Sequence, residues 1–435
     1  MSFTIVTFLL TILLFGTNDA HELLKLKHNK VVVCYVASWA AYRVDNGAFS
    51  IGNLRPELCT HLVYAFAGLN VTSWKIRSLD PWADMEKDVI GNYRKMTALR
   101  QKYPGLKVSL GIGGWNEGSK NYSNLASSPN LRRTFVASTI EFLKTYEFDG
   151  LDLDWEFPGS RGGAPSDKQN FVHLVKELSD AYREHHLSLT AAISADKKTI
   201  DLAYNIPEIS KYLNHIFVMA YDYHGTWDKK VLPNSPLRSN DGLSVEDSIT
   251  YLLERGTPSE KLVLGLPMYG RTFILAKKPE EPNINPIGLP ALTTGFKGPY
   301  TGQEGFMGFN EICESLTKYS NDWTKGWDSD TSTAYAIKED RVVVYDNIKT
   351  IMAKVEYVKK KKLAGVMVWS IDTDDFRGEC YGSDFPIMTA INKVLANTTT
   401  IDVKPPVAPN ASSKQLLSHV VLILSFMMIY LTKFN

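Results

Sequence analysis

Three carboxylates alternate with apolar residues in one short stretch of the sequence. In FDGLDLDWEFPG, residues 148–159, Asp152, Asp154 and Glu156 occupy every second position, with leucine or tryptophan beside them. A β-strand points successive side chains to opposite faces, so the three acids share one face. If that face is buried, the acids should have raised pKa values, which is typical of an active site. The alternative is a strand of an antiparallel sheet whose acids face water.

The acids belong to one of eight short apolar runs. We expect strands at 31–39, 61–69, 107–115, 150–156, 187–194, 215–222, 261–268 and 365–372. Most runs precede a segment of helical period, such as residues 167–186. This alternation predicts an α/β fold, a closed parallel (β/α)8 TIM barrel in which the strand carboxyl ends carry the chemistry.

A closed barrel decides how the acids are oriented. Both faces of each strand are covered in such a barrel, so the leucines and the tryptophan pack outward and the acids point inward. Buried carboxylates without partners cost several kcal/mol each, roughly, so they should share protons and have raised, coupled pKa values. The sequence therefore predicts an active site at the end of the fourth strand.

The gap between the seventh and eighth strands is far longer than one helix. It is rich in Gly, Pro and aromatic residues from about residue 272 to residue 340. We expect a small α+β insertion domain there, beside the mouth of the barrel.

The two ends of the chain indicate the secretory route. Residues 1–20 resemble a signal peptide, with an uncleaved membrane anchor as the alternative. Residues 396–415 form a Thr/Pro/Ser-rich stalk, and residues 416–435 a hydrophobic tail. That tail fits a glycolipid-anchor signal, a short membrane anchor or a plain tail, in that order. We expect an extracellular protein, anchored at the cell surface or secreted.

Sequons and cysteines agree with an oxidising compartment. The candidate glycosylation sites are Asn70, Asn121, Asn397 and Asn410. The four cysteines favour two disulfides, although three pairings are possible. A net charge of +1 without a strongly basic domain argues against nucleic acid as a partner. Nine histidines show no zinc spacing, so we expect no metal and no cofactor.

The motif DGLDLDWE resembles the D-x-x-D-x-D-x-E signature of the chitinases of glycoside hydrolase family 18. The resemblance covers residues 30–395 and includes SLGIGGW, MAYDYHG, GLPMYGRTF and GVMVWSID at the third, sixth, seventh and eighth strands. It implies hydrolysis of β-1,4-linked N-acetylglucosamine polymers by an endo-acting, retaining mechanism. In this mechanism the sugar's own acetamide oxygen attacks and an oxazolinium ion forms.

The resemblance also implies roles for individual residues. Glu156 would be the general acid, Asp154 would orient the acetamide N–H, Asp152 would share a proton with it, and Tyr221 would donate to the acetamide carbonyl. The implied substrate-binding residues are Trp369, Trp39, Trp115, Trp227, Tyr35, Tyr269, Arg271, Met219, Asp222 and Gly114. For Trp39, Trp227 and Tyr35, plain packing remains the alternative. The implied disulfides pair Cys34 with Cys59 and Cys313 with Cys380.

Chitin or chito-oligosaccharides are the expected partners of a monomeric enzyme. The alternatives are a chitinase-like lectin that binds sugars without cutting them, and a hydrolase of the chitobiose core of N-glycans. Lectin relatives lose the terminal acid of the motif, and this chain keeps all four acids. This chain carries Val342 where many relatives carry Trp. The difference puts in doubt either the packing or the cleft wall at the edge of the insertion.

Overall fold

The computed structural model describes residues 28–85, 91–281, 284–318 and 320–397. The predicted signal peptide at 1–20, the tail at 416–435, nearly all of the stalk and Asn410 lie outside the described residues. Within these described ranges, no helix combines the length and the apolar character that a membrane crossing needs.

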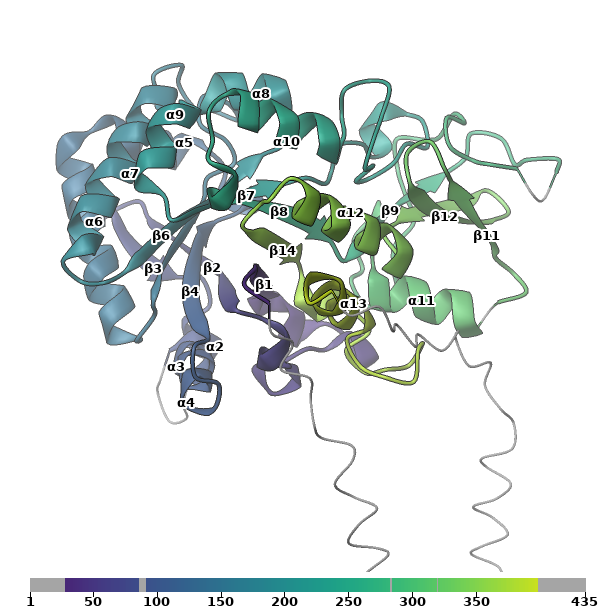
Figure 1. Cartoon of the computed structure of the whole chain (residues 1–435), viewed down its shortest axis with the longest axis horizontal. Helices are drawn as coiled ribbons and strands as arrows, with labels where there is room; N and C mark the ends of the chain where they lie inside the picture. Colours follow the sequence, from purple (N-terminus) through teal and green to yellow (C-terminus); the bar gives the residue numbers. More distant parts are fainter. Residues whose placement is uncertain (1–27, 86–90, 282–283, 319, 398–435) are drawn as a thin grey trace, which may run out of the picture.

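Eight parallel strands close into a barrel at the centre of the molecule (Figure 1). They are β1 (Val31–Ala37), β2 (His61–Asn70), β4 (Lys107–Gly113), β5 (Gly150–Asp154), β6 (Ser188–Ser194), β7 (His215–Met219), β8 (Leu262–Pro267) and β14 (Gly365–Trp369). β1 pairs with β14 on one side and with β2 on the other, which closes the sheet. The predicted (β/α)8 barrel is therefore confirmed. A short extra strand, β3 (Lys75–Ser78), pairs antiparallel with β2 and was not predicted.

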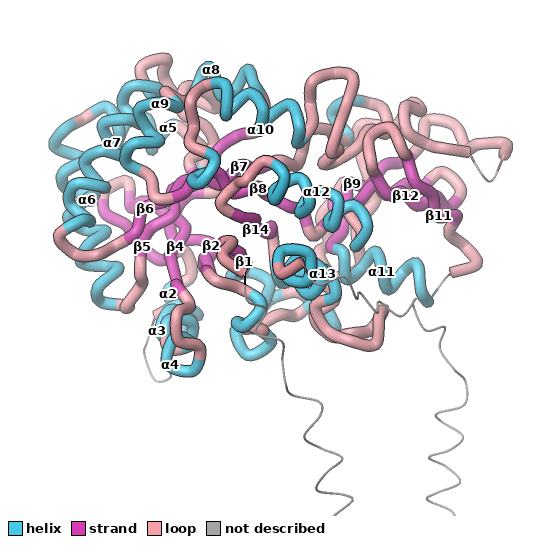
Figure 2. Tube along the Cα trace, in the orientation of Figure 1, coloured by secondary structure: helices cyan, strands magenta, loops and turns pink. Residues whose placement is uncertain are grey.

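Helices surround the barrel, as the cyan segments of Figure 2 show. They are α2 (Pro81–Asp84), α3 (Asn92–Thr97), α4 (Leu99–Lys102), α5 (Lys120–Ser127), α6 (Pro129–Thr145), α7 (Asp167–Arg183), α8 (Lys197–Ala203), α9 (Ile206–Tyr212), α10 (Val245–Glu254), α12 (Ile348–Lys360) and α13 (Pro386–Leu395). Short 3-10 helices lie at Ser38–Tyr42, Asp45–Gly47, Ile51–Asn53, Pro56–Leu58, Trp115–Glu117, Thr226–Asp228, Ser259–Lys261 and Ile371–Thr373.

Alternation along the strands separates two apolar layers. On β5, Leu151 and Leu153 point outward and join the large core between strands and helices. The barrel interior has its own cluster, formed by Val33, Tyr35, Val63, Ala65, Phe66, Ala192, Phe217, Val263 and Met367. These side chains fill the barrel, so Asp152 and Asp154 share their face with a packed apolar core.

In its described residues the insertion is a five-stranded antiparallel sheet with one helix, and it lies to the right of the barrel in Figure 1. Its elements are β9 (Tyr269–Ile274), β10 (Phe306–Gly308), α11 (Phe309–Lys318), β11 (Thr324–Asp328), β12 (Thr333–Lys338) and β13 (Arg341–Tyr345). The first and last strands along the chain, β9 and β13, extend past the expected bounds of 272–340. Val342 is fully buried in the apolar core of this sheet, so the departure at this position concerns packing.

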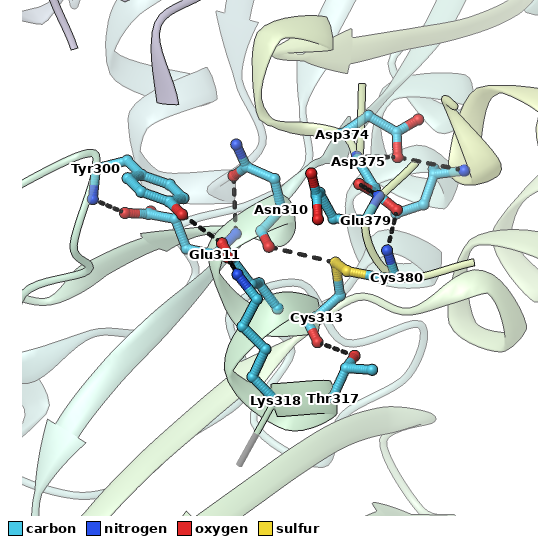
Figure 3. Close-up of a disulfide and its surroundings, with 12 residues drawn as sticks. Tyr300, Asn310, Glu311, Cys313, Thr317, Lys318, Asp374, Asp375, Glu379 and Cys380 are labelled. Atoms are coloured by element: carbon cyan, nitrogen blue, oxygen red, sulfur yellow. Dashed lines mark hydrogen bonds and ion pairs between the residues drawn. A yellow bond between two sulfur atoms is a disulfide. The ribbon is translucent and has the colours of Figure 1, made fainter. Parts of the chain in front are cut away.

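Both predicted disulfides are present. Cys34 on β1 is bonded to Cys59, two residues before β2, and so ties the first two barrel strands together. Cys313 on α11 is bonded to Cys380, which ties the insertion to the loop after β14 (Figure 3).

Candidate active site

Asp152 is the innermost of the three acids and is fully buried. Its two carboxylate oxygens are each held by a hydroxyl group: Tyr35 donates at 2.5 Å and Thr190 at 2.6 Å. Burial raises the pKa of Asp152 to about 6, and these two hydrogen bonds oppose the rise because they stabilise the ionised form.

Asp154 ends β5 and is also buried, with 4% of its surface exposed. Its Oδ1 has no hydrogen-bond partner among the described residues. Burial, followed by the charges of Glu156 and Asp152, raises the pKa of Asp154 well above its usual range. A buried acceptor without a partner costs about 1–3 kcal/mol, so a ligand that donates a hydrogen bond there would recover part of this energy.

The neighbouring strand approaches Asp154 through two glycines. Gly114 donates its backbone N–H to the Asp154 carbonyl at 2.8 Å. Gly113 has a φ of +114°, and a Cβ at that position would lie 2.2 Å from the Asp154 carbonyl oxygen. Only glycine fits this conformation and this spacing. The contacts of Gly114 thus place it as a support for Asp154.

Glu156 lies just beyond β5 and is partly exposed. Burial raises the pKa of its carboxyl group to about 7; the Arg161 charge lowers it and the Asp222 charge raises it. The Arg161 guanidinium also donates to the Glu156 backbone carbonyl at 2.9 Å. A carboxyl group that is half protonated near neutral pH is suited to donate a proton.

Tyr221 comes from the segment after β7, beside the acids. Its ring meets Tyr269 edge to face at 6.0 Å, and the hydroxyl group lies 3.9 Å from the Met367 sulfur. Burial, and then the charge of Asp154, raise the pKa of Tyr221 well above its usual range, so the hydroxyl keeps its proton and can donate a hydrogen bond. Met219, the last residue of β7, packs against the barrel interior.

Asp222 joins the barrel to the insertion. Its Oδ1 accepts from the Tyr269 hydroxyl at 2.6 Å and from Arg271 Nε at 2.9 Å, and Arg271 Nη2 lies 2.6 Å away. The Arg271 guanidinium also lies 5.3 Å from the ring centre of Trp227. Four of the predicted binding residues therefore form one connected group.

Trp369, at the end of β14, lies at the centre of an aromatic group. Its ring stacks with Phe66 at 5.7 Å, meets Tyr35 edge to face at 5.5 Å and is tilted against Trp39 at 6.0 Å. Trp39 also stacks with Phe66 at 6.1 Å. Apolar ring faces of this kind bind the C–H faces of sugars.

Three of the predicted tryptophans are more than 40% exposed: Trp39, Trp115 and Trp227. Trp115 makes its ring contact with the Arg161 guanidinium at 3.5 Å, and not with the group around Trp369. Its backbone carbonyl accepts a hydrogen bond from the same guanidinium at 2.9 Å. Large exposed indole rings on fixed supports are typical of carbohydrate-binding surfaces.

The sequence reasoning missed Thr190, Arg161 and Phe66. Thr190 could have been noticed, because it is a polar residue in the middle of a predicted strand and shares the inward parity of its face. Arg161 follows the acid motif by five residues and gave no periodic signal. Phe66 has the parity of an outward residue, but a register shift between Tyr64 and Ala67 turns it inward.

The predicted glycosylation sites are accessible to different degrees. Asn70 ends β2, and its Oδ1 accepts N–H groups of Thr72 and Ser73 at 3.0 and 3.1 Å. Asn121 lies on α5 and lines a surface hollow together with Asn70. Asn397 is exposed at the end of the described chain.

One group of potential metal ligands occurs within the described ranges: Cys313, Asp375 and Cys380. Its two sulfur atoms are bonded to each other, and a disulfide sulfur is not the thiolate that binds metal ions.

Comparisons with known proteins place this geometry in a family. Residues 31–374 match the protein family described as Glycosyl hydrolases family 18. Probable chitinase 2 of Drosophila melanogaster is 52% identical over 363 residues, which are 81% of this chain and 74% of that protein. Group IV chitinase of Ostrinia furnacalis, crystallised with allosamidin, is 40% identical with a TM-score of 0.81, over 85% of this chain and 100% of that chain. Human YKL-39 is described as a pseudo-chitinase with retained chitooligosaccharide binding properties. It is 33% identical with a TM-score of 0.74, over 84% of this chain and 99% of that chain.

Proposed function

This chain belongs to the glycosyl hydrolases of family 18 and is a glycoside hydrolase of the chitinase type. On that premise, we propose that it cleaves β-1,4-linked N-acetylglucosamine polymers at internal bonds with retention of configuration. The observation that carries this proposal is the set of three groups at the mouth of the barrel. They are a carboxyl group with a pKa of about 7 on Glu156, an unpartnered oxygen of Asp154, and the hydroxyl of Tyr221.

The first step uses all three groups. The acetamide carbonyl oxygen of the sugar attacks the anomeric carbon while Glu156 gives its proton to the leaving glycosidic oxygen. A C–O bond forms as the glycosidic C–O bond breaks, and an oxazolinium ion results. Tyr221 donates to the acetamide oxygen and so orients it for attack. Asp154 accepts the acetamide N–H and stabilises the positive charge that develops.

The second step restores the enzyme. Water attacks the anomeric carbon from the side that the leaving group vacated, and Glu156, now a carboxylate, takes its proton. The oxazolinium ring opens, and the sugar keeps its original configuration. Asp152 lies behind Asp154, and its raised pKa of about 6 suits it to share a proton with that residue during the cycle.

Sugar binding is assigned to the aromatic and polar groups around these acids. Trp369 forms the floor beneath the reacting sugar, and Trp39, Trp115 and Trp227 extend the platform on either side. Tyr269 and Arg271 hold Asp222, which contacts sugar hydroxyl groups. The Tyr35 hydroxyl is already committed to Asp152, so its role is to fix that carboxylate.

The cellular setting is proposed from covalent structure. Two disulfides support folding in an oxidising compartment, which agrees with a signal peptide at residues 1–20 and with glycans on Asn70, Asn121 or Asn397. We assign the protein to the extracellular side as a monomer, held at the surface by its C-terminal tail or secreted.

Product analysis on a chitin hexamer tests the proposal. We expect internal cleavage to shorter oligomers that initially carry the β anomer. In the Glu156→Gln variant, hydrolysis should fall by about a thousandfold, since the proton donor is lost. Glu254→Gln, a change at the exposed end of α10, is the matched control and should leave hydrolysis unchanged.

The alternatives give different results in the same assay. Hexamer binding without cleavage would indicate a lectin, and cleavage of a glycoprotein but not of the hexamer would indicate a chitobiose-core hydrolase. Undiminished hydrolysis by Glu156→Gln would refute the assignment of the acid.

A further inference from the structure

The segment that carries Tyr221 and Asp222 lies beyond the regular strand, because β7 ends at Met219. Asp222 has a φ of +56°, in the left-handed region that non-glycine residues rarely occupy. Strand pairing does not hold this conformation, so neighbouring groups must fix it.

A two-residue segment of the following loop supplies the fixing contacts. The Asn234 side-chain oxygen accepts the N–H of Asp222 at 3.0 Å, and its backbone carbonyl accepts the N–H of Tyr223 at 3.1 Å. Ser235 donates its hydroxyl to the Ala220 carbonyl at 2.6 Å. Asn234 and Ser235 are both buried. Together they hold the backbone on both sides of Tyr221.

Ser235 is itself held by a buried lysine from a distant part of the chain. Lys354, on α12, has none of its surface exposed. Its Nζ donates to Ser235 Oγ at 2.7 Å and to Asp346 Oδ1 at 2.6 Å. Asp346 is 4% exposed and also accepts the Thr350 hydroxyl at 2.6 Å. Because the lysine ammonium donates to Ser235, the serine hydroxyl is left to donate to Ala220.

A buried ion pair of this kind contributes little net stability. Removing two charges from water costs about as much as their attraction returns, and apolar residues of similar size often serve stability as well. The ion pair instead orients its neighbour, because the charged Lys354 donor, in a buried site, fixes the direction of the Ser235 hydroxyl.

We propose that Lys354 is a positioning residue for hydrolysis, which acts through Ser235 and the Ala220 carbonyl to hold the Tyr221 hydroxyl where the sugar acetamide reacts. This inference rests on the proposed function, because it assigns the final effect to Tyr221. It also gives a role to the segment after the insertion: α12 follows β13, so the chain that returns from the insertion supports the active site from behind.

The sharpest test deletes the bridging hydroxyl and keeps the ion pair. Ser235→Ala should lower kcat on the chitin hexamer by about threefold to tenfold, the effect of one lost hydrogen bond, and leave KM unchanged. The matched control is Ser210→Ala on α9, because Ser210 is also buried and donates to one carbonyl, that of Ile206, at 2.7 Å. This control should lose comparable thermal stability and keep the wild-type kcat.

A double-mutant cycle locates the effect. In a Tyr221→Phe background the reacting hydroxyl is already absent, so Ser235→Ala should cost little further kcat. Replacing both charges, Lys354→Met with Asp346→Leu, should give a folded protein with kcat lowered by about tenfold to a hundredfold, because small misplacements of reacting groups are costly.

The outcomes separate the two proposals. An unchanged kcat in Ser235→Ala, an equal fall in Ser210→Ala, or a full additional loss in the Tyr221→Phe background would overturn the role of Lys354 and leave the hydrolase assignment intact. Absence of hexamer cleavage by the wild-type protein would overturn the proposed function itself.

Discussion

Two acidic side chains in this molecule, one partly exposed and one fully buried, have similar pKa values and different surroundings. Burial raises the pKa of Glu156 to about 7 at the mouth of the barrel, and it raises the pKa of Asp374 to about 7 beside α13. Asp374 accepts backbone N–H groups of Asp375 at 2.8 Å and Met388 at 3.0 Å, so it caps the start of α13. Next to Glu156, by contrast, Asp154 Oδ1 has no partner within the described chain.

The contrast teaches that a raised pKa indicates burial, and that other features must indicate catalysis. Asp375 repeats the pattern of its neighbour, because it accepts the N–H groups of Glu379 and Cys380 at 2.9 Å each (Figure 3). The acid pair near the disulfide is thus saturated by backbone donors and holds a loop. Asp154, at the end of β5, keeps one carboxylate oxygen free among the described residues.

The largest expected effect concerns activity. Asp154→Asn should lower kcat on the chitin hexamer by about a hundredfold, because it removes the negative charge that faces the developing positive charge. Asp374→Asn should leave the kcat of the folded protein unchanged. Steady-state kinetics below the pKa of Glu156 provides the measurement. Equal losses in both variants would remove the distinction between the two acid groups.

The second effect concerns stability, and here the Asp374 variant should be affected more than the Asp154 variant. Asp374→Ala should lower the free energy of unfolding by about 2 kcal/mol, since backbone donors at the start of α13 lose their acceptor. Asp154→Asn should leave this free energy unchanged or raise it, because burial disfavours the charged form of Asp154 and an amide has no charged form. Urea unfolding followed by circular dichroism measures both. A larger loss in Asp154→Asn would contradict the comparison.

The smallest effect is a shift in the pH profile. Glu156 must be protonated to act as the acid, so kcat/KM should fall as the pH rises through about 7. The Arg161 charge lowers the pKa of Glu156, so Arg161→Gln should move this alkaline limb to higher pH. Arg161→Lys keeps the charge and should leave the limb near its wild-type position. Asp374→Asn should not move the alkaline limb. A shift of the limb in that variant would show that Asp374 affects the pKa of Glu156 and would contradict the comparison.

Much of the barrel was predictable because its signals are local. Alternation placed Asp152 and Asp154 inside and Leu151 and Leu153 outside, and all eight barrel strands appear where the apolar runs indicated. β3 was missed because four residues carry too little periodicity to indicate a strand. The expected insertion began three residues too late in the sequence, since β9 begins at Tyr269, only two residues after β8.

The parts of the site that escaped prediction depend on contacts between distant segments. The inward turn of Phe66 follows from a change of register, which alternation cannot show. The link from Lys354 to Ser235 joins residues 119 positions apart. Asp374 and Asp375 stand in WSIDTDDF, where nothing in the local sequence says that their partners are the backbone of α13 and of the disulfide loop.

The way in which the insertion is joined to the barrel has a consequence for how such enzymes change. β9, which begins the insertion, is hydrogen-bonded to β13, which ends it, with Gly270 opposite Tyr345. The chain therefore departs and returns at neighbouring points, and β14 pairs with β8 with Gly365 opposite Val263. We therefore expect that residues 275–340 can change in length without changing how β14 pairs with β8, provided that Cys313 keeps its bond to Cys380, and that Glu156, just beyond β5, then stays in place.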